Sequence, residues 1–433
     1  MSKEVQIHVE HLTRVEGHGN ILMNAKDGSI KNVEWQISEA PRFFESFVRG
    51  RPYHELSHIT SRICGICSIG HALASLKATE AAMNIPVSDQ TVMLRKLALH
   101  GENMQSHILH VGYLVAPDLF GVGSVIPLVS SAPEVVKKII ALHRLANEMS
   151  DLLCGRTTHP ITLIPGGFSE IPSEKQLLHL KSRLTDIILI CEEVATVVLE
   201  NADKLPDFSR ETEYIGLTSK DEYALYDGDI GSTDTKPIDV DKYESVVNEF
   251  TVQQSTAKYC KHKRQSYMVG ALARFNINAD LLHPLAKKWA KKFGLKPVCY
   301  NPFMNNIAQL VEYVHSVEDS IALIDAILDA GLNRLERPKY SISKGRGVGA
   351  VEVPRGILFH DYTYNDEGIC TKANCVIPTN QNHNNIQHDM EAFAPTLLDR
   401  PEKEIELNLE MLVRAYDPCI SCSTHYLDVT FEH

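Results

Sequence analysis

The chain has 433 residues, of which 44% are hydrophobic and 23% are charged, the balance of a globular protein with one large domain or several ordinary ones. Its 43 Lys and Arg against 55 Asp and Glu give a net charge of −12, which argues against nucleic acid as a partner. No stretch reaches the roughly 18 uncharged apolar residues of a membrane helix, and the first residues lack the apolar core of a secretion signal. We therefore expect a cytoplasmic protein without direct membrane insertion.

The N-terminal segment predicts a small β-sheet. Apolar and polar residues alternate over 5–9, which indicates a half-buried strand. The dipeptide Asp27-Gly28 then separates two further apolar runs, 21–25 and 33–37, as in a β-hairpin. After Pro41 the pattern becomes helical.

Four long helices are expected farther along the chain. Apolar residues at helical spacing predict two of them over 93–114 and 135–153. The sequence Ser-Glu-Lys-Gln at 173–176 is typical of a capping box and should open a helix that runs to about Asn201. A fourth helix is expected over about 317–331, where a glycine is suited to end it.

Two segments interrupt the helical pattern. Residues 211–252 are polar, acidic and rich in Gly, Asp and Thr, which indicates an irregular or strand-containing excursion. Residues 340–384 are rich in Gly, Pro and Asn, with short apolar runs. Because no repeat or convincing linker divides the chain, we predict one α+β domain over 1–433 that is predominantly α-helical and carries loop-rich insertions.

Two Cys-x-x-Cys pairs stand near opposite ends of the chain, at 64–67 and 419–422. Two intervening residues allow both thiolates of a pair to reach one metal ion. A structural zinc site usually separates its pairs by roughly 15–20 residues, whereas most of this protein lies between them. A metal bound by both pairs would lie deep inside the domain, which favours a catalytic or redox centre. For either pair alone, a redox pair, a zinc half-site or coincidence remains an alternative.

Each cysteine pair is followed by a histidine, His71 after the first and His425 after the second. A histidine at this spacing can be a ligand, or it can donate a hydrogen bond to a metal-bound thiolate. Two such matched signatures at opposite ends of one chain are not expected by chance.

These segments resemble two motifs of [NiFe]-hydrogenase large subunits, Arg-x-Cys-Gly-x-Cys-x-x-x-His at 62–71 and Asp-Pro-Cys-x-x-Cys-x-x-His at 417–425. The run Gly-Arg-Gly-Val-Gly-Ala before Pro354 is similar to the sequence found at this place in the cytosolic, multimeric, cofactor-coupled group of that family. The resemblance implies the hydrogenase large-subunit fold, with a central bundle of long helices and a small N-terminal β-sheet. It extends to further segments at 13–18, 42–45, 353–356 and 376–379.

The resemblance implies that the thiolates of Cys64, Cys67, Cys419 and Cys422 hold nickel, and that Cys67 and Cys422 also bind an iron bearing CO and cyanide. Soft, anionic sulfur suits both metals. Such a centre catalyses the reversible reaction H2 = 2 H+ + 2 e−. Cys419 is the expected first base, and Glu16 matches the carboxylate that passes the proton on. Without the family, Glu16 would be interpreted as a salt-bridged residue at the end of a strand.

Further residues around the metals follow from the same resemblance. Arg355 would lie over the open metal position, next to Pro354, and Thr379 would donate to a cyanide. His71 would donate to a bridging thiolate, expected to be Cys422, and Asp417 would shape the canopy. Taken alone, the Pro-Arg-Gly turn would be interpreted as a surface loop. Relatives carry another canopy carboxylate near 102–110, where this chain offers Gln-Ser-His, so that role stays unassigned.

A second metal site, for Mg2+ or iron, is implied at Glu45, His425 and the backbone carbonyl of Cys375. Carboxylate and carbonyl oxygens suit magnesium, while a histidine ligand is less usual. The chain continues past His425 through 426–433, and this extension resembles the segment that a maturation endopeptidase removes in the family. The other five cysteines are expected to be ordinary buried thiols: Cys154, Cys191, Cys260, Cys299 and Cys370.

The leading functional hypothesis is therefore the catalytic subunit of a [NiFe]-hydrogenase. No cysteine pattern for an iron–sulfur cluster remains, so electrons should leave through a small subunit that carries such clusters. Its partner subunits would be flavin-, NAD(P)-, deazaflavin-, ferredoxin- or heterodisulfide-reductase-linked. The alternatives are a regulatory H2 sensor, which normally lacks the C-terminal extension, and a structural subunit like that of respiratory complex I, whose relatives have lost the cysteines. A simple zinc clamp is the remaining alternative.

Overall fold

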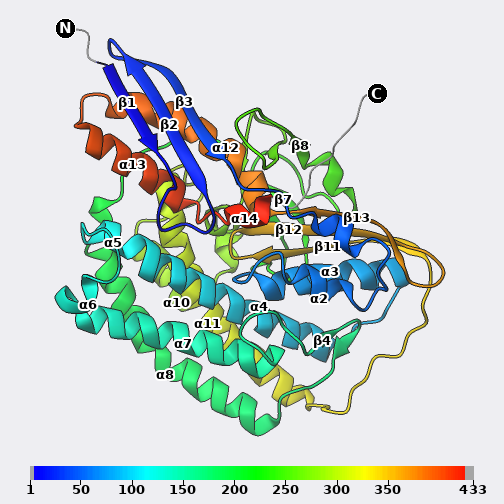
Figure 1. The fold of residues 1–433 in the computed structure, drawn as a ribbon. Helices are drawn as coiled ribbons and strands as arrows, with labels where there is room; N and C mark the ends of the chain where they lie inside the picture. The colour runs from blue at the N-terminus through cyan, green and yellow to red at the C-terminus, as the bar shows by residue number, and fades with distance from the viewer. Residues whose placement is uncertain (1–3, 425–433) are drawn as a thin grey trace, which may run out of the picture.

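The computed structural model of the protein describes residues 4–424. Long helices make up one side of the molecule, an N-terminal sheet projects at one end, and a second sheet crosses the middle (Figure 1). This arrangement has both helices and separate small sheets, which agrees with the predicted α+β class. None of the helices over 4–424 combines the length and apolar character that crossing a bilayer requires.

The N-terminal sheet has three antiparallel strands in the order β1-β2-β3. Their bounds are Glu4–Val9 for β1, Gly19–Lys26 for β2 and Ser29–Ile37 for β3. Met23 of β2 lies between Ile7 of β1 and Val33 of β3 in the register, so the alternating apolar residues share one buried face. The predicted hairpin is confirmed, and both residues of its Asp27-Gly28 turn have positive φ, as this tight turn requires.

Four long helices form the bundle, with bounds α4 Asp89–Leu109, α7 Pro133–Cys154, α8 Glu174–Leu199 and α11 Asn305–Ala330. Both α4 and α8 pack against α7 and against α11. The predicted capping box of α8 is confirmed, because the side chains of Ser173 and Gln176 each accept a hydrogen bond from the other residue's backbone. At its C-terminal end α4 widens into a π-helical turn, His110–Val115, a feature that is frequent at functional sites.

One helix and the first half of another were not predicted, because their sequences are too polar to show an apolar helical pattern. Helix α11 begins at Asn305, whereas the sequence predicted a start near residue 317. The first half was missed because it carries polar side chains, such as Gln309 and Glu312, that are nevertheless buried. Helix α12, Pro378–Phe393, begins inside a segment that was expected to be loop-rich. Hydrophobic periodicity cannot mark a helix whose buried contacts are polar on most sides.

The second sheet lies directly against the helix that follows the first cysteine pair. Its antiparallel order is β11-β12-β13, with bounds Gly345–Val353, Gly356–Tyr364 and Cys370–Val376, and the helix is α3, Ser68–Met83. Alternate glycines of β11 face α3. A Cβ atom at these positions would lie 2.0–2.3 Å from a helix carbonyl oxygen, in the pairs Gly345–Ala82, Gly347–Ala78 and Gly349–Ala74. The glycine alternation therefore has a packing reason, because it lets a strand lie on the backbone of a helix.

The remaining elements are short and connect these layers. The polar excursion over 211–252 does contain strands, as predicted. The bounds of these strands are β6 Glu213–Thr218, β7 Asp229–Ser232 and β8 Asn248–Phe250. Other short elements are α1 Phe44–Val48, α9 Ala271–Asn278, α10 Pro284–Lys292, α13 Glu402–Ala415 and α14 Ile420–Ser423.

The contact between β11 and α3 can be tested with Gly347→Ala. The added methyl would overlap the carbonyl of Ala78, so we expect the free energy of unfolding to fall by about 3 kcal/mol or the chain to misfold. Thermal and denaturant unfolding followed by circular dichroism would measure the change. The nearby variant Lys344→Ala is the control, because that side chain is 71% exposed and its ion pair with Asp366 should contribute less than about 1 kcal/mol. Equal losses for the two variants would contradict this account of the packing.

Candidate metal centre

The two cysteine pairs meet in one buried place. Cys64 and Cys67 lie just before α3, and Cys419 and Cys422 lie at α14, with all four side chains buried. Sγ of Cys64 is 3.5 Å from Sγ of Cys419, and the sulfur atoms of Cys419 and Cys422 are in contact. The sulfur atoms of Cys64, Cys419 and Cys422 all lie within 4.8 Å of one another. Residues from opposite ends of the chain thus form a single group of sulfur ligands.

Cys67, the remaining cysteine of the two pairs, is hydrogen-bonded to Cys64. The backbone N–H of Cys67 donates to Sγ of Cys64 at 3.2 Å, and the two thiols also share a hydrogen bond. That bond lowers the pKa of Cys64, with a further lowering by Arg355, while the same bond and burial raise the pKa of Cys67. Thiol sulfur is a soft ligand that becomes anionic when it binds a metal, and the guanidinium of Arg355 favours that charge on these buried cysteines. Such ligands fit a thiophilic transition metal and not Mg2+ or Ca2+.

Arg42 ties the two cysteine segments together. Its Nη2 donates to the carbonyl of Ile63 at 2.7 Å and also to the carbonyl of Ser421. Its backbone N–H donates to the carbonyl of Thr424 at 2.7 Å. Sequence reasoning placed Arg42 in a matching segment but gave it no role, because nothing in the local pattern indicates which distant carbonyls it reaches.

Glu16 lies against the second cysteine pair. It forms an isolated parallel β-bridge with Cys419, in which the N–H of Ile420 donates to the carbonyl of Glu16 at 3.0 Å. Its carboxylate Oε2 accepts from the N–H of Ser421 at 3.1 Å. The close approach of this segment to residues 419–421 requires glycine at position 17, because Gly17 has φ +85° and a Cβ there would lie 2.8 Å from Ser421 N. A backbone amide at the metal centre therefore holds this carboxylate, which differs from the strand-end ion pair considered above.

Arg355 is buried beside the cysteines in a two-point contact with Asp417. Its Nε donates to the carbonyl of Asp417 at 2.6 Å and its Nη2 to Oδ1 at 2.8 Å, while Nη1 lies 3.4 Å from Ser106 Oγ. Asp417 has φ 51°, a conformation that non-glycine residues rarely adopt and that is concentrated at functional sites. Burial alone would lower the pKa of Arg355, but Asp417 and the thiols of Cys67 and Cys64 raise it, so the guanidinium stays charged.

Arg274 of α9 holds the loop that carries Arg355 from behind. Its Nη1 and Nη2 donate to the carbonyls of Val353 and Pro354, each at 3.0 Å. Two buried carboxylates neutralise it, one of which is Glu312 of α11 at 2.6 Å. Pro354, predicted to lie by the metals, thus has its carbonyl fixed by an arginine that no motif marked. The only signal in the sequence is an arginine inside the otherwise apolar start of α9.

Thr379 and His71 both lie at helix starts near the cysteines. Thr379 is in the first turn of α12, and its Oγ1 accepts from the N–H of Cys419 at 3.1 Å. His71 is in the first turn of α3, and its Nδ1 lies 3.2 Å from Nε2 of His360. The expected bond of Thr379 to a cyanide and of His71 to Cys422 stay predictions.

A buried carboxylate binds the start of α3. Glu102 of α4 accepts from the N–H of Ile69 at 2.6 Å and from that of Gly70 at 3.1 Å. Burial raises the pKa of Glu102 to about 8, although these amide hydrogen bonds oppose the rise. In the segment where relatives carry a canopy carboxylate, Ser106 is the side chain that lies next to Arg355. Sequence reasoning could not separate these two positions, because both lie on one helix without a motif.

The second predicted metal site is described only in part. Glu45 of α1 and Cys375 of β13 are both buried, and burial raises the pKa of the Cys375 thiol, with a further rise from the nearby Glu45 carboxylate. The hydrogen bond from Arg42 N–H to the carbonyl of Thr424 brings Thr424, the last described residue, close to the start of α1. His425 lies outside the described residues, so the magnesium site stays a prediction. Of the other five cysteines, Cys299 is partly exposed. The remaining four are buried as expected, namely Cys154, Cys191, Cys260 and Cys370.

The variant Arg42→Met tests the clamp between the cysteine segments. It keeps the length of the side chain but loses both side-chain hydrogen bonds, each worth about 1.5–3 kcal/mol for a charged donor. We expect the metal retained per chain after dialysis against a chelator to fall at least about tenfold. Elemental analysis would measure it. Arg51→Met is the control, since that side chain is 58% exposed, and an equal loss in both variants would count against the clamp.

Comparison with known proteins identifies the family. The model for nickel-dependent hydrogenases matches residues 42–141 and 209–425. The alpha chain of sulfhydrogenase 1 from Pyrococcus furiosus is 34% identical over 425 residues, covering 97% of this chain and 97% of the relative. The matching chain of the F420-non-reducing hydrogenase from Methanothermobacter marburgensis is 31% identical over 464 residues, covering 98% of this chain and 95% of that one.

Solved structures agree with the sequence matches. The crystal structure of an NAD+-reducing [NiFe]-hydrogenase in the H2-reduced state superposes with a TM-score of 0.88 at 28% identity, covering 97% of this chain and 99% of that chain. The Ni-Fe-Se hydrogenase of D. vulgaris Hildenborough shares the fold, with a TM-score of 0.75 at 23% identity, covering 98% of this chain and 100% of that one. The chain therefore belongs to the nickel-dependent hydrogenase family and is the catalytic large subunit of a [NiFe]-hydrogenase, an oxidoreductase that acts on H2.

Proposed function

We propose that this chain catalyses reversible cleavage of H2 within an assembly that exchanges the electrons with a soluble acceptor. The convergence of four buried cysteines from opposite ends of the chain, beside a buried arginine–aspartate pair, carries the proposal. Those thiolates would hold nickel, and Cys67 and Cys422 would also bind an iron with CO and cyanide. When bound, that centre supplies the electron-accepting site at which H2 is split.

The surrounding side chains then have separate tasks. Arg355 stays charged in a site without bulk water, where a fixed guanidinium polarises a small molecule more strongly than in water. Asp417 orients it through two contacts. Cys419 would take the first proton, and Glu16, bridged to the same segment, would receive it and pass it outward. Each proton thus leaves the interior through groups that this chain supplies.

The acceptor and the partners belong to the proposal as well. Relatives of this chain are named as subunits of a sulfhydrogenase, an F420-non-reducing hydrogenase and an NAD-reducing hydrogenase. We propose a small subunit with iron–sulfur clusters and further subunits that are linked to NAD(P), a deazaflavin, ferredoxin or a heterodisulfide reductase system. The cytoplasmic location expected from the sequence stays a prediction.

Maturation completes the proposal. Residues 426–433 would be removed by an endopeptidase once nickel is in place, which leaves one catalytic domain that ends at His425. Glu45, His425 and the carbonyl of Cys375 would then bind Mg2+ or iron. The buried pair Glu45 and Cys375 supports this position.

Metal analysis and infrared spectroscopy of the purified complex test the function. We expect nickel and iron together, with one CO and two cyanide stretching bands, and H2-dependent reduction of a dye at rates typical of turnover. Zinc alone, or no bands in a complex with a trimmed C-terminus and a nickel supply, would contradict the proposal. Bands accompanied by only trace turnover would indicate an H2 sensor.

Glu16→Gln tests the proton relay. The amide keeps the hydrogen bond from Ser421 N–H but cannot take up and release a proton, so H2-dependent dye reduction should fall by about 100-fold or more. Nickel content and the CO and cyanide bands should not change. Glu10→Gln is the control, because that side chain is 71% exposed. Unchanged turnover in Glu16→Gln would remove this residue from the relay.

A further inference from the structure

One face of helix α12 holds the segment that carries the second cysteine pair. In the first turn of α12, Thr379 accepts from the N–H of Cys419. Nδ2 of the next residue, Asn380, donates to the carbonyl of Ser423 at 2.8 Å. His383 follows one turn later on the same face, and its Nε2 lies 2.9 Å from Oγ of Ser423. Three side chains of this face therefore reach the segment, and the sequence motifs marked only the first of them.

Trp35 of β3 determines which ring nitrogen of His383 carries the hydrogen. An indole N–H can only donate, and Nε1 of Trp35 lies 3.0 Å from Nδ1 of His383, so that nitrogen is the acceptor. The other nitrogen, Nε2, then carries the hydrogen and donates to Oγ of Ser423. The serine hydroxyl in turn donates to the carbonyl of Ile420 at 2.6 Å, which closes the turn of α14. The indole therefore sets the direction of each hydrogen bond from β3 to α14.

The surroundings of His383 keep its imidazole neutral. The side chains of Trp35, Tyr259 and His383 are all buried, and the ring of Tyr259 stacks on the imidazole with 5.8 Å between the centroids. Burial lowers the pKa of His383 to about 3, so the ring carries no charge near pH 7. A protonated ring would turn an N–H toward the indole N–H and would lose that hydrogen bond. The site thus requires a side chain with one acceptor and one donor.

The donor at the start of this chain of hydrogen bonds is itself held in place. The backbone N–H of Trp35 donates at 2.8 Å to Oε1 of Gln387, which lies one turn beyond His383 on α12. The carbonyl of Trp35 accepts from the hydroxyl of Tyr259 at 3.0 Å. Because the backbone of Trp35 is fixed on both sides, its indole presents the N–H to His383 in one orientation.

We propose that His383 is a positioning residue for the H2 reaction, which holds the turn of α14 so that Cys422 keeps its place among the sulfur ligands. The inference rests on the function proposed above. Ser423 directly follows Cys422, so the hydrogen bond from His383 restrains the backbone that carries a cysteine proposed to bind both metals. A misplacement of about 1 Å near a reacting group can cost roughly a hundredfold in rate. The imidazole therefore acts through the cysteine segment and does not itself touch the metals.

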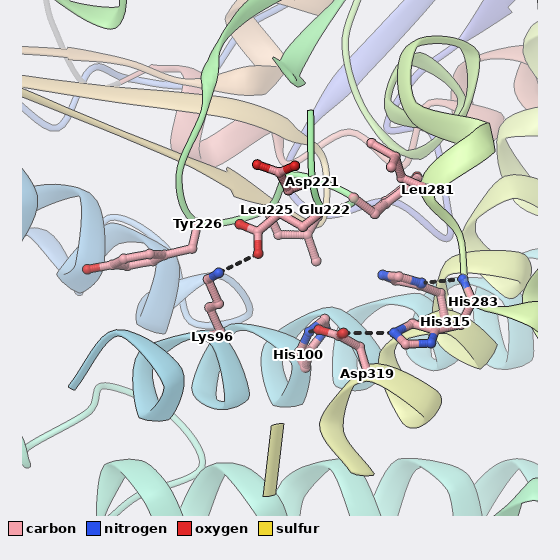
Figure 2. A pocket seen from close by; sticks show the side chains of 11 residues that line it. Lys96, His100, Asp221, Glu222, Leu225, Tyr226, Leu281, His283, His315 and Asp319 are labelled. Carbon is pink, nitrogen blue, oxygen red and sulfur yellow. Dashed lines mark hydrogen bonds and ion pairs between the residues drawn. The ribbon is translucent and has the colours of Figure 1, made fainter. Parts of the chain in front are cut away.

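A second buried histidine provides the matched control. Figure 2 shows His315 of α11 in a pocket of about 350 Å³, with His283 and Asp319. Burial lowers the pKa of His315 to about 3 as well, and its Nδ1 accepts from the backbone N–H of His283 at 3.2 Å. His315 thus matches His383 in burial, in charge and in its accepting Nδ1. Its hydrogen bond leads to this pocket and not to a cysteine segment.

Crystal structures of the purified complex test the positioning without reference to turnover. In His383→Leu we expect the turn at 420–423 to move by about 1 Å while α12 stays in place, because the serine hydroxyl loses its donor. Ser423→Ala removes the same hydrogen bond from its other end and should move the turn similarly, which covers the case that leucine prevents assembly. His315→Leu should leave 420–423 in place. An unmoved turn in the variants at 383 and 423 would overturn the proposal.

Infrared spectroscopy and turnover of the same complexes give the second test. In His383→Leu the CO and cyanide bands should shift or broaden, and H2-dependent dye reduction per nickel should fall at least about tenfold. His383→Gln should restore most of both, because its amide offers an acceptor to Trp35 and a donor to Ser423. His315→Leu should keep the bands and the rate of the wild type. Unchanged bands and rates in His383→Leu, or equal changes in the two leucine variants, would contradict the positioning role.

Trp35→Phe tests whether the indole directs the chain of hydrogen bonds. It removes the N–H but keeps an aromatic ring, so the infrared bands should change as in His383→Leu but by less. Added to His383→Leu, it should have no further effect on the bands, whereas independent packing losses would add. Additive changes would overturn the chain. A wild-type complex without CO and cyanide bands would instead refute the proposed function, and the crystal structures would still decide the positioning.

Discussion

The sulfur atoms of Cys64 and Cys419 lie 3.5 Å apart although the two residues are 355 positions apart in the chain, and the rest of the structure is arranged to make that contact possible. Thiolates held this close in a buried site repel one another and lose their hydration. Two kinds of restraint oppose that tendency. The charge of Arg355 lies beside the sulfurs, and rigid elements press the two segments together from both sides. The contact of β11 with the backbone of α3 anchors the first pair, while the bridge from Glu16 anchors the second.

Sequence reasoning recovered the parts of this site that are local in the chain. Cys-x-x-Cys spacing, the hairpin at Asp27-Gly28 and the capping box of α8 depend on a few neighbouring residues, so their patterns can be read directly. The motifs that surround the cysteines also predicted the family and the fold. What could not be predicted is which distant backbone group each arginine would reach. Arg42 and Arg274 each donate to carbonyls far along the chain, and no periodicity records such a contact.

The helices that escaped prediction show the same limit in another form. Helix α12 is rich in amides, and they bond to backbone carbonyls of neighbouring segments: Asn380 to Ser423, Gln381 to Ile357 and Asn382 to Val269. Hydrogen bonds of this kind satisfy the buried amides, so α12 needs no simple apolar stripe to pack. The first half of α11 behaves similarly. Buried polar side chains thus recur in elements that face the site, and they hid α12 and the first half of α11 from hydrophobic periodicity.

The position of the second cysteine pair has a consequence for the order of assembly. Residues 417–424 accept or donate hydrogen bonds to side chains of Glu16, Arg42, Thr379 and Arg355, which come from four separate regions of the chain. These residues are also the last to be synthesised among those described. The helix bundle and the two sheets described above make their own contacts without these residues. Residues 417–424 are therefore not needed to hold those parts together, but without them Cys64 would lack its contact with Cys419 and the group of sulfur ligands would be incomplete.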